Sequence, residues 1–442
     1  MGWAREEFKD LELGDARRSQ RLIKLVDDLS GQPTGSIPLA CGGWPETKAA
    51  YRLLDNPAVE WREILEVHST RTVERLAGQP VVLCLQDTTE LDFTSQPGIA
   101  GLGRLSYEAQ HGLYVHPTLA VTPTGVALGV LDAWMWARKP KDQPDLKEST
   151  RWVEGHEIVA DLADTVPDTR LVYIADREGD LRALIDAAAR RGTSADWLIR
   201  SQHNRKTTSG EKLWDRLIQS EPLGEVEFTL PATPARPARS VRQTLYRTVV
   251  TLPAHHGQPA VPVTAILARE EHPPAGEPAI EWRLLTNRTA ETLEDVVQLI
   301  DWYRKRWLIE IFFRIWKSGC RVEALQLGTL ERLERALVIY LIIAWRILHL
   351  VTWGRDGPNL PCDVVFDPAE WQAAWIVAHR TPPPETPPPL GQMVRLVAAF
   401  GGFLGRKHDG YPGPKALWEG MQKVSAFAIA FEATRTVYAR DG

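Results

Sequence analysis

The stretch LVYIADREGDLRALIDAAARRGTSADWLIR (residues 171–200) carries the pattern on which the fold prediction depends. Its two ends, LVYIA (171–175) and DWLIR (196–200), are short and mostly apolar, which is typical of buried strands. Between them, DLRALIDAAARR (180–191) has the length and composition of a helix. A strand, a crossover helix and a second strand predict parallel pairing in an α/β core.

Strand-like segments on either side extend this core. VVLCLQ (81–86) predicts another buried strand, and residues 112–137 predict two strands around the turn Thr122–Gly125. A charged helix is expected at 148–164. Between residues 224 and 288, VEFTL, TLYRTVVTL, VPVTAILA and EWRLLT alternate with Pro/Gly turns, which predicts an antiparallel β insertion.

Both ends of the chain are expected to be helical. Residues 5–75 contain helical segments rich in basic side chains, and TPPPETPPP (381–389) predicts a stiff linker before a mostly helical segment at 390–440. The most apolar run, LVIYLIIAWRILHLVTW (337–353), is shorter than a membrane span and contains Arg and His. We therefore expect a buried core helix there and no membrane partner.

Composition narrows the class of protein. With 442 residues the chain is long enough for about three domains, and 44% hydrophobic and 25% charged residues are ordinary for a globular protein. The formal charge of -5 excludes a strongly basic protein that coats nucleic acid, although local basic patches remain compatible with it. The four cysteines form no C-x-x-C pair, and the N-terminus lacks the apolar run of a signal peptide. A cytoplasmic location is expected.

Two aspartates follow predicted strands directly. Asp87 comes after VVLCLQ and Asp176 after LVYIA. Strand ends of an α/β sheet point side chains into the ligand crevice, so the two carboxylates are expected to meet there. Paired carboxylates suit Mg²⁺ or Mn²⁺, which prefer oxygen ligands. The alternative is that each Asp caps the turn or helix that follows it.

A third acid lies in a predicted amphipathic helix. At about 100° per residue, Tyr303, Arg306, Glu310 and Lys317 fall within roughly a 60° arc, opposite an apolar face. Cations beside a metal-binding Glu are suited to phosphodiester chemistry. The alternative is a solvated polar face in which Arg306 and Glu310 form an ordinary i,i+4 pair.

These residues resemble a known family. The pattern Tyr303-x-x-Arg306-x-x-x-Glu310-x-x-x-x-x-x-Lys317 has the spacing of the Y-R-E-K signature of DDE cut-and-paste transposases in the insertion-sequence-four family. The resemblance extends over nearly the whole chain, through LGDARRSQRL, YRLLDNP, QDTTELDF, DREGDL, IRSQH, EWRLLTN and GGFLGRKHDGYPGPKALWEG.

The resemblance implies an RNase H-like catalytic core with an antiparallel β insertion, flanked by two helical regions. Residues 1–75 would be the DNA-end-binding domain and residues 76–379 the catalytic domain, with the insertion at about 205–288. Residues 390–442, after the Pro-rich linker, would form a helical dimerisation segment.

The resemblance also implies roles for single residues. Asp87, Asp176 and Glu310 would be the catalytic triad and would hold two Mg²⁺ ions, for which Mn²⁺ can substitute. Further residues would contact DNA: Tyr303, Arg306 and Lys317 at phosphates, Trp282 by stacking on a flipped base, Arg200, His203 and Arg205 along the DNA channel, and Arg17, Arg18, Arg21 and Arg52 at the terminal repeat. Gln202 departs from the family, where a basic residue stands. Without the resemblance, Trp282 reads as an ordinary core residue of a strand.

The expected function is that of a transposase that binds the terminal repeats of its mobile element in double-stranded DNA. It would cleave the ends through a hairpin intermediate and join the 3′ ends to target DNA, as a homodimer in a synaptic complex without an organic cofactor. In a bacterial cytoplasm it would be nucleoid-associated when bound to DNA. The alternatives are a catalytically silent DNA-binding protein derived from a transposase and an RNase H-like nuclease that cuts without strand transfer.

Overall fold

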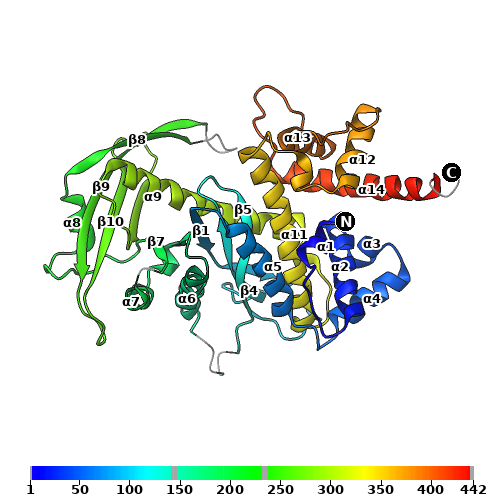
Figure 1. Cartoon of the computed structure of the whole chain (residues 1–442). Coiled ribbons are helices and arrows are strands. Elements are labelled where there is room, and N and C mark those ends of the chain that lie inside the picture. The colour runs from blue at the N-terminus through cyan, green and yellow to red at the C-terminus, as the bar shows by residue number, and fades with distance from the viewer. Residues whose placement is uncertain (1, 141–142, 144–146, 193, 231–236, 439–442) are drawn as a thin grey trace. The chain divides into compact units, whose positions relative to one another are not determined.

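The computed structural model describes residues 2–140, 143, 147–192, 194–230 and 237–438 (Figure 1). Residue 1 and residues 439–442, at the ends of the predicted terminal segments, lie outside the described part, as do residues 231–236 of the predicted insertion. The chain folds into two compact units. Unit 1 comprises Met1–Leu76, Thr88–Asp145 and Leu308–Gly442, and unit 2 comprises Ala77–Asp87 and Leu146–Trp307.

Unit 2 is built on a mixed β-sheet. Its strands, in their order across the sheet, are β1 (Val81–Gln86), β6 (Arg170–Ala175), β7 (Asp196–Arg200), β11 (Glu281–Thr286), β10 (Val261–Glu270), β9 (Arg239–Leu252) and β8 (Pro222–Leu230). The first three run parallel, and all later neighbours are antiparallel. β1 and β6 are almost wholly buried, as continuous apolar runs predict for parallel strands. The prediction of an α/β core with an antiparallel insertion is confirmed.

Helices join the parallel strands of unit 2, because parallel neighbours cannot be connected by a tight hairpin. These helices are α6 (Thr150–Thr165), which precedes β6, and α7 (Arg182–Arg191), whereas α8 (Leu213–Ile218) follows β7 and α9 (Leu293–Lys305) follows β11. α6 packs against β1 and β6, and α7 connects β6 to β7. α9 starts at a capping box in which Thr292 and Asp295 exchange side-chain and backbone hydrogen bonds, and it contacts β7, β8 and β9.

Unit 1 contains the N-terminal helices, a small antiparallel sheet and the C-terminal helices. Its elements are α1 (Trp3–Glu7), α2 (Ala16–Gly31), α3 (Ile37–Cys41), α4 (Trp44–Leu54), α5 (Trp61–Leu76), β2 (Thr89–Asp92), β3 (Gly103–Arg104), β4 (His111–Val121), β5 (Ala127–Trp136), α10 (Trp307–Arg314, from its second residue onward), α11 (Leu330–Asp356), α12 (Pro368–His379), α13 (Leu390–Phe400) and α14 (Pro414–Tyr438). β4 and β5 form the predicted hairpin, whose turn is closed by a bond from the Thr122 N–H to the Val126 carbonyl (2.9 Å). The helical character predicted for both ends is confirmed for the described residues.

α11 is the central helix of unit 1. It is long and apolar enough to cross a membrane, but 94% of its most apolar window is buried inside the molecule, as expected of a core helix. It packs against α2, α4, α5 and β5, and also against α13 and α14. Near its start, Arg335 donates hydrogen bonds to the carbonyl oxygens of Val59 (2.5 Å) and Leu54 (3.0 Å). One helix therefore supports both the N-terminal and the C-terminal helices.

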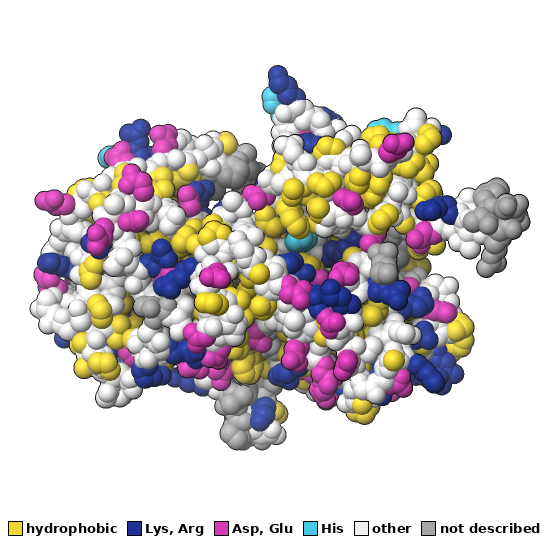
Figure 2. Space-filling view, in the orientation of Figure 1, with side chains coloured by type: hydrophobic (Ala, Val, Ile, Leu, Met, Phe, Trp, Pro, Cys, Tyr) yellow, Lys and Arg dark blue, Asp and Glu magenta, His cyan; other side chains and the backbone are white. Residues whose placement is uncertain are grey.

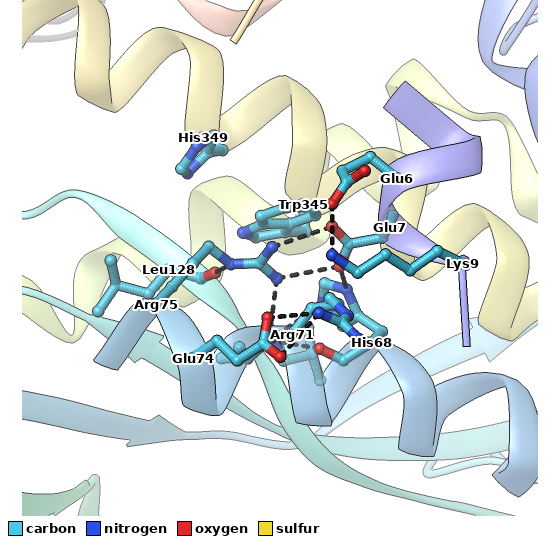
Figure 3. A network of polar contacts seen from close by, with 12 residues as sticks. Glu6, Glu7, Lys9, His68, Arg71, Glu74, Arg75, Leu128, Trp345 and His349 are labelled. Atoms are coloured by element: carbon cyan, nitrogen blue, oxygen red, sulfur yellow. Dashed lines mark hydrogen bonds and ion pairs between the residues drawn. The ribbon is translucent and has the colours of Figure 1, made fainter. Parts of the chain in front are cut away.

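A buried polar network ties α1 to α5, β5 and α11 (Figure 3). We call Glu7, His68, Arg75 and Trp345 the Glu7 network. His68 Nε2 accepts the Val130 N–H at 3.0 Å, so this nitrogen carries no proton, and Nδ1 donates to Glu7 Oε1 at 2.5 Å. Arg75 donates two bonds to the Glu7 carboxylate, at 2.9 and 3.0 Å. The Arg75 guanidinium and the His68 ring both lie against the Trp345 indole, at 4.3 and 4.7 Å from its centroid.

The surface carries charges of both signs. On the face drawn in Figure 2, Lys and Arg side chains are interspersed with Asp and Glu. This distribution accords with the small formal charge of -5.

Candidate active site

Asp87 and Asp176 lie at the same edge of the parallel sheet in unit 2. The register pairs Leu85 of β1 with Ile174 of β6, and two further residues along each strand bring Asp87 beside Asp176. Neighbouring strands lie about 4.8 Å apart, so the two aspartates start from adjacent positions. Asp176 Oδ1 also accepts the Glu178 N–H at 2.8 Å. One of its two carboxylate oxygens therefore caps the turn that follows the strand, as the alternative interpretation predicted.

Arg200 continues this row on the next strand. Ala175 of β6 pairs with Ile199 of β7, so Arg200 follows beside Asp176. Its own pairing partner on the other side is Leu284 of β11. The ends of three neighbouring strands thus carry Asp87, Asp176 and Arg200 side by side.

Tyr303 and Arg306, at the end of α9, complete the cluster within unit 2. Arg306 Nη1 donates to Asp87 Oδ2 at 2.5 Å. Burial raises the pKa of Tyr303, whereas the charges of Arg306 and Arg200 lower it and that of Asp176 raises it further, so these charged groups lie near the phenol. The structure therefore brings together five predicted site residues from segments far apart in the chain.

The paired aspartates fit a divalent cation. Carboxylate oxygens are the ligands that Mg²⁺ and Mn²⁺ prefer, and Arg306 already places a positive group on Asp87. Glu310, on α10, belongs to unit 1, whereas both aspartates belong to unit 2. Among the residues that the structure describes, no group of three or more His, Cys, Asp or Glu side chains is arranged so that it could hold a metal ion.

The predicted helix around Glu310 is not continuous. α9 ends at Lys305, where the Arg306 N–H bonds the Tyr303 carbonyl in a tighter turn, and α10 begins at Trp307. Lys317 lies in a π-helical turn, Ile315–Gly319, closed by a bond from the Cys320 N–H to the Ile315 carbonyl (2.9 Å). The expectation of a single helical arc was wrong in this respect. Most of the predicted apolar face is buried, at Ile309, Phe312, Phe313, Ile315 and Trp316, whereas Leu308 and Ile311 of that face are half-buried.

Trp282 is partly buried on β11. Its indole lies nearly parallel to the ring of Phe228 from β8, with centroids 5.9 Å apart and planes at 16°. The Arg304 guanidinium lies 5.0 Å from the centre of the Phe228 ring. Trp282 thus has a packing partner, as the strand-residue interpretation expected, and part of its surface remains accessible.

The segment after β7 is held by a residue that sequence reasoning missed. Asp180 is 1% exposed, and its Oδ2 accepts the backbone N–H groups of Gln202 (2.6 Å) and His203 (2.9 Å). Arg205 donates to Asp180 Oδ1 at 2.5 Å and to its carbonyl at 2.7 Å. A second aspartate four residues after Asp176, in D-R-E-G-D, was the available signal. Arg205 has a structural partner, and its contact with DNA stays a prediction.

The predicted DNA-end contacts lie on α2 and α4. Arg17, Arg21 and Arg52 are exposed, whereas Arg18 donates to the Leu13 carbonyl at 2.5 Å. α4 also begins with Trp44, whose side chain is 75% exposed. Exposed cations beside an exposed aromatic ring suit a nucleic-acid surface.

Three models of protein families match successive parts of the chain. Residues 1–59 match "Transposase DNA-binding", residues 151–346 match "Transposase DDE domain", and residues 342–441 match "Transposase Tn5 dimerisation domain". The chain belongs to the Tn5-like DDE transposases. The match to the DDE domain includes Asp176 and Glu310 and begins after Asp87.

This transposase therefore has a DNA-binding region at its N-terminus, a central DDE region and a dimerisation region at its C-terminus. The DDE region implies a nuclease chemistry that depends on divalent metal. The first region contains the exposed arginines of α2 and α4, and the last contains most of α11 together with α12, α13 and α14.

Proposed function

We propose that this transposase excises its element by a cut-and-paste reaction, with Asp87, Asp176 and Glu310 holding two Mg²⁺ ions. The observation that carries the proposal is the placement of Asp87 beside Asp176, with Arg306 bonded to Asp87 and Tyr303 close to both arginines. Such ions, when bound, neutralise charge on a reacting phosphate and make an oxygen nucleophile available at neutral pH.

The protein's own cationic side chains would bind the DNA phosphates at this site. Arg306 neutralises Asp87 while no other cation is there, and it becomes available to a DNA phosphate once Asp87 binds metal. Arg200, beside Asp176, offers a second guanidinium for the same strand. Lys317 offers a point charge seven residues after Glu310. These groups would hold the scissile phosphate while its charge increases.

The reaction we propose proceeds through a hairpin. The 3′-hydroxyl released by the first cut attacks the opposite strand, water reopens the hairpin, and the freed 3′ end joins target DNA. Trp282 would receive a base extruded from the strained duplex, since aromatic faces stack on unpaired bases. The exposed Arg17, Arg21 and Arg52 would bind the terminal repeat, and a homodimer would pair two ends.

Glu310→Gln provides the test. The wild-type protein, incubated with Mn²⁺ and a linear duplex carrying the terminal repeat of its own element, should give a hairpin-length product on a denaturing gel. Glu310→Gln should bind the duplex equally well but give no product, because a neutral amide oxygen holds Mg²⁺ or Mn²⁺ much more weakly than a charged carboxylate. Glu294→Gln, in the exposed first turn of α9, is the matched control and should cut normally.

Each other outcome has a definite meaning. Cleavage by Glu310→Gln would remove that residue from the site. Nicked products without hairpins or joined strands would favour a nuclease without strand transfer. Binding without any cleavage by the wild-type protein would favour a silent relative.

A further inference from the structure

A groove in unit 1 contains Lys317 together with residues that have no role in the proposal above. We call it the Lys317 groove. It has a volume of about 610 Å³ and is lined by Ser95, Gln96, Lys317, Ser318, Arg321, Glu323, Ala324 and Gln326. Most of these side chains are exposed, so the groove is open to solvent along its length.

Hydrogen bonds join the two walls of the groove. The Asp92 N–H donates to Glu323 Oε1 at 2.9 Å, and Gln96 Nε2 donates to the Glu323 carbonyl at 2.9 Å. Asp92 Oδ1 in turn accepts the Thr94 N–H at 2.8 Å, which closes the turn that presents Ser95. The only carboxylate of the lining is thus bonded within the protein, and the walls are set before any ligand binds.

The backbone of the second wall is held in uncommon conformations. Lys317 and Ser318 lie in the π-helical turn, and Arg321 has a φ of 50°, in the left-handed region that non-glycine residues rarely adopt. π-helical turns and left-handed residues occur disproportionately at binding sites, where a structural cost is retained for function. Here their effect is to turn the side chains of Lys317 and Arg321 toward the same groove.

Both cations are available for a ligand. Among the residues that the structure describes, the side chains of Lys317 and Arg321 have no hydrogen-bond or ion-pair partner. The rest of the lining offers serine hydroxyls and glutamine amides, which with Lys and Arg are the usual donors to phosphate oxygens. An open groove of polar groups does not suit an apolar small molecule, which requires an enclosed apolar pocket.

We propose that the Lys317 groove binds the phosphate backbone of DNA and that Arg321 makes a phosphate contact of its own beside that of Lys317. The proposal rests on the proposed function for the presence of DNA, but it adds a residue and a surface to it. The phosphates can come from the element end or from target DNA, which have the same chemistry.

The salt dependence of DNA binding measures this contact directly. The logarithm of the association constant falls linearly with the logarithm of salt concentration, with a slope of about -0.9 per neutralised phosphate. Arg321→Gln should therefore make the slope shallower by about 0.9, and combining it with Lys317→Gln should make it shallower by about 1.8. Arg321→Lys should keep the wild-type slope.

Two further variants control for folding and for net charge. Arg321→Gly removes the side chain while suiting the positive φ, so its fold should be retained and its slope should match that of Arg321→Gln. Arg242→Gln removes another exposed guanidinium, one that pairs with Glu225 and Glu227 in unit 2, and its slope should stay at the wild-type value.

Two duplexes distinguish the source of the phosphates. If the slope becomes shallower only with the element-end duplex, the groove binds the element end. If it becomes shallower only with an unrelated duplex, the groove binds target DNA. If it becomes shallower with both duplexes, the groove binds DNA of either source. An unchanged slope with both duplexes, in Arg321→Gln and Arg321→Gly alike, overturns the proposal. Because the measurement needs no cleavage, failure of the catalytic proposal would leave this result intact.

Discussion

Replacing Arg75 with methionine removes the cation of the Glu7 network while keeping a long apolar side chain. Arg75 makes two hydrogen bonds to Glu7, whose side chain is 8% exposed, and stacks on Trp345. His68 is neutral, because its Nε2 accepts the Val130 N–H, so Arg75 supplies the positive charge that balances Glu7. The variant leaves a carboxylate buried without that charge.

The expected magnitude follows from the pKa of Glu7. Burial by itself raises this pKa, but His68 and Arg75 outweigh burial and lower it from 4.5 to about 2. A shift of this size corresponds to about 3 kcal/mol between the two protonation states, and because His68 and Arg75 share it, it is an upper bound for Arg75 alone. Breaking a fully buried ion pair by removing one partner costs about 3–5 kcal/mol, and Arg75 is 24% exposed, so we expect Arg75→Met to weaken the docking of α1 by up to about 3 kcal/mol.

The pH dependence has a definite sign. The folded-state pKa of Glu7 lies below its unfolded value, so its contribution to stability is present above pH 4.5 and is lost as the pH falls toward about 2. In Arg75→Met the buried carboxyl prefers to be protonated, and its pKa rises. The destabilisation should therefore be largest at pH 7 and smaller at pH 4.

Hydrogen exchange of the peptides that cover α1 and α5 measures this effect. A loss of about 3 kcal/mol in local stability makes exchange about 10²-fold faster. Arg71→Met, one turn earlier on α5, is the control: Arg71 pairs with Glu74 and Asp10, which are 56% and 62% exposed. Arg71 itself is buried, but both carboxylates stay solvated when it is removed, so the loss of these pairs should cost below about 1 kcal/mol. Equal effects of the two variants, or a loss in Arg75→Met that does not change with pH, would refute the reasoning.

Two further predictions concern the C-terminal helices and the segment after β7. Gly420→Ala should lower the stability of the α13–α14 pair by about 1–3 kcal/mol, because the added methyl group would collide with the Val397 carbonyl oxygen. Thermal unfolding measures this loss, and Gly413→Ala is the control, because a methyl group at Gly413 would face open space and should leave the stability unchanged. Asp180→Asn should weaken DNA binding and speed hydrogen exchange over residues 201–206, because an amide group offers one acceptor oxygen where the carboxylate offers two. Unchanged exchange over that segment would contradict the second prediction.

The sequence predicted the parallel core because the evidence was local. Apolar runs ending at Asp87, Asp176 and Arg200 predicted buried strands, and parallel strands place their carboxyl ends on one edge. The three residues accordingly lie in one row. The turn Thr122–Gly125 was predictable for the same reason, since its Pro and Gly act through neighbouring backbone alone.

Features set by distant contacts were not predictable in this way. The 3.6-residue period continues through Arg306, yet the helix is interrupted there, where the side chain bonds Asp87, 219 residues away in the sequence. The π-helical turn at Ile315–Gly319 and the role of Asp180 likewise depend on the packed structure. A single sequence shows which residues carry charge but not which partner each charge meets.

The position of α11 has a consequence for the synthesis of the protein. Arg335 of α11 bonds Val59, which precedes it by 276 residues. At roughly 5–20 residues per second, the N-terminal helices leave the ribosome roughly 15–55 s before the helix on which they pack has been translated. During that interval the apolar faces of α2, α4 and α5 that α11 later covers are exposed. We therefore expect the nascent transposase to be a substrate for chaperones until α11 has emerged, and a chain that ends before residue 330 to remain one.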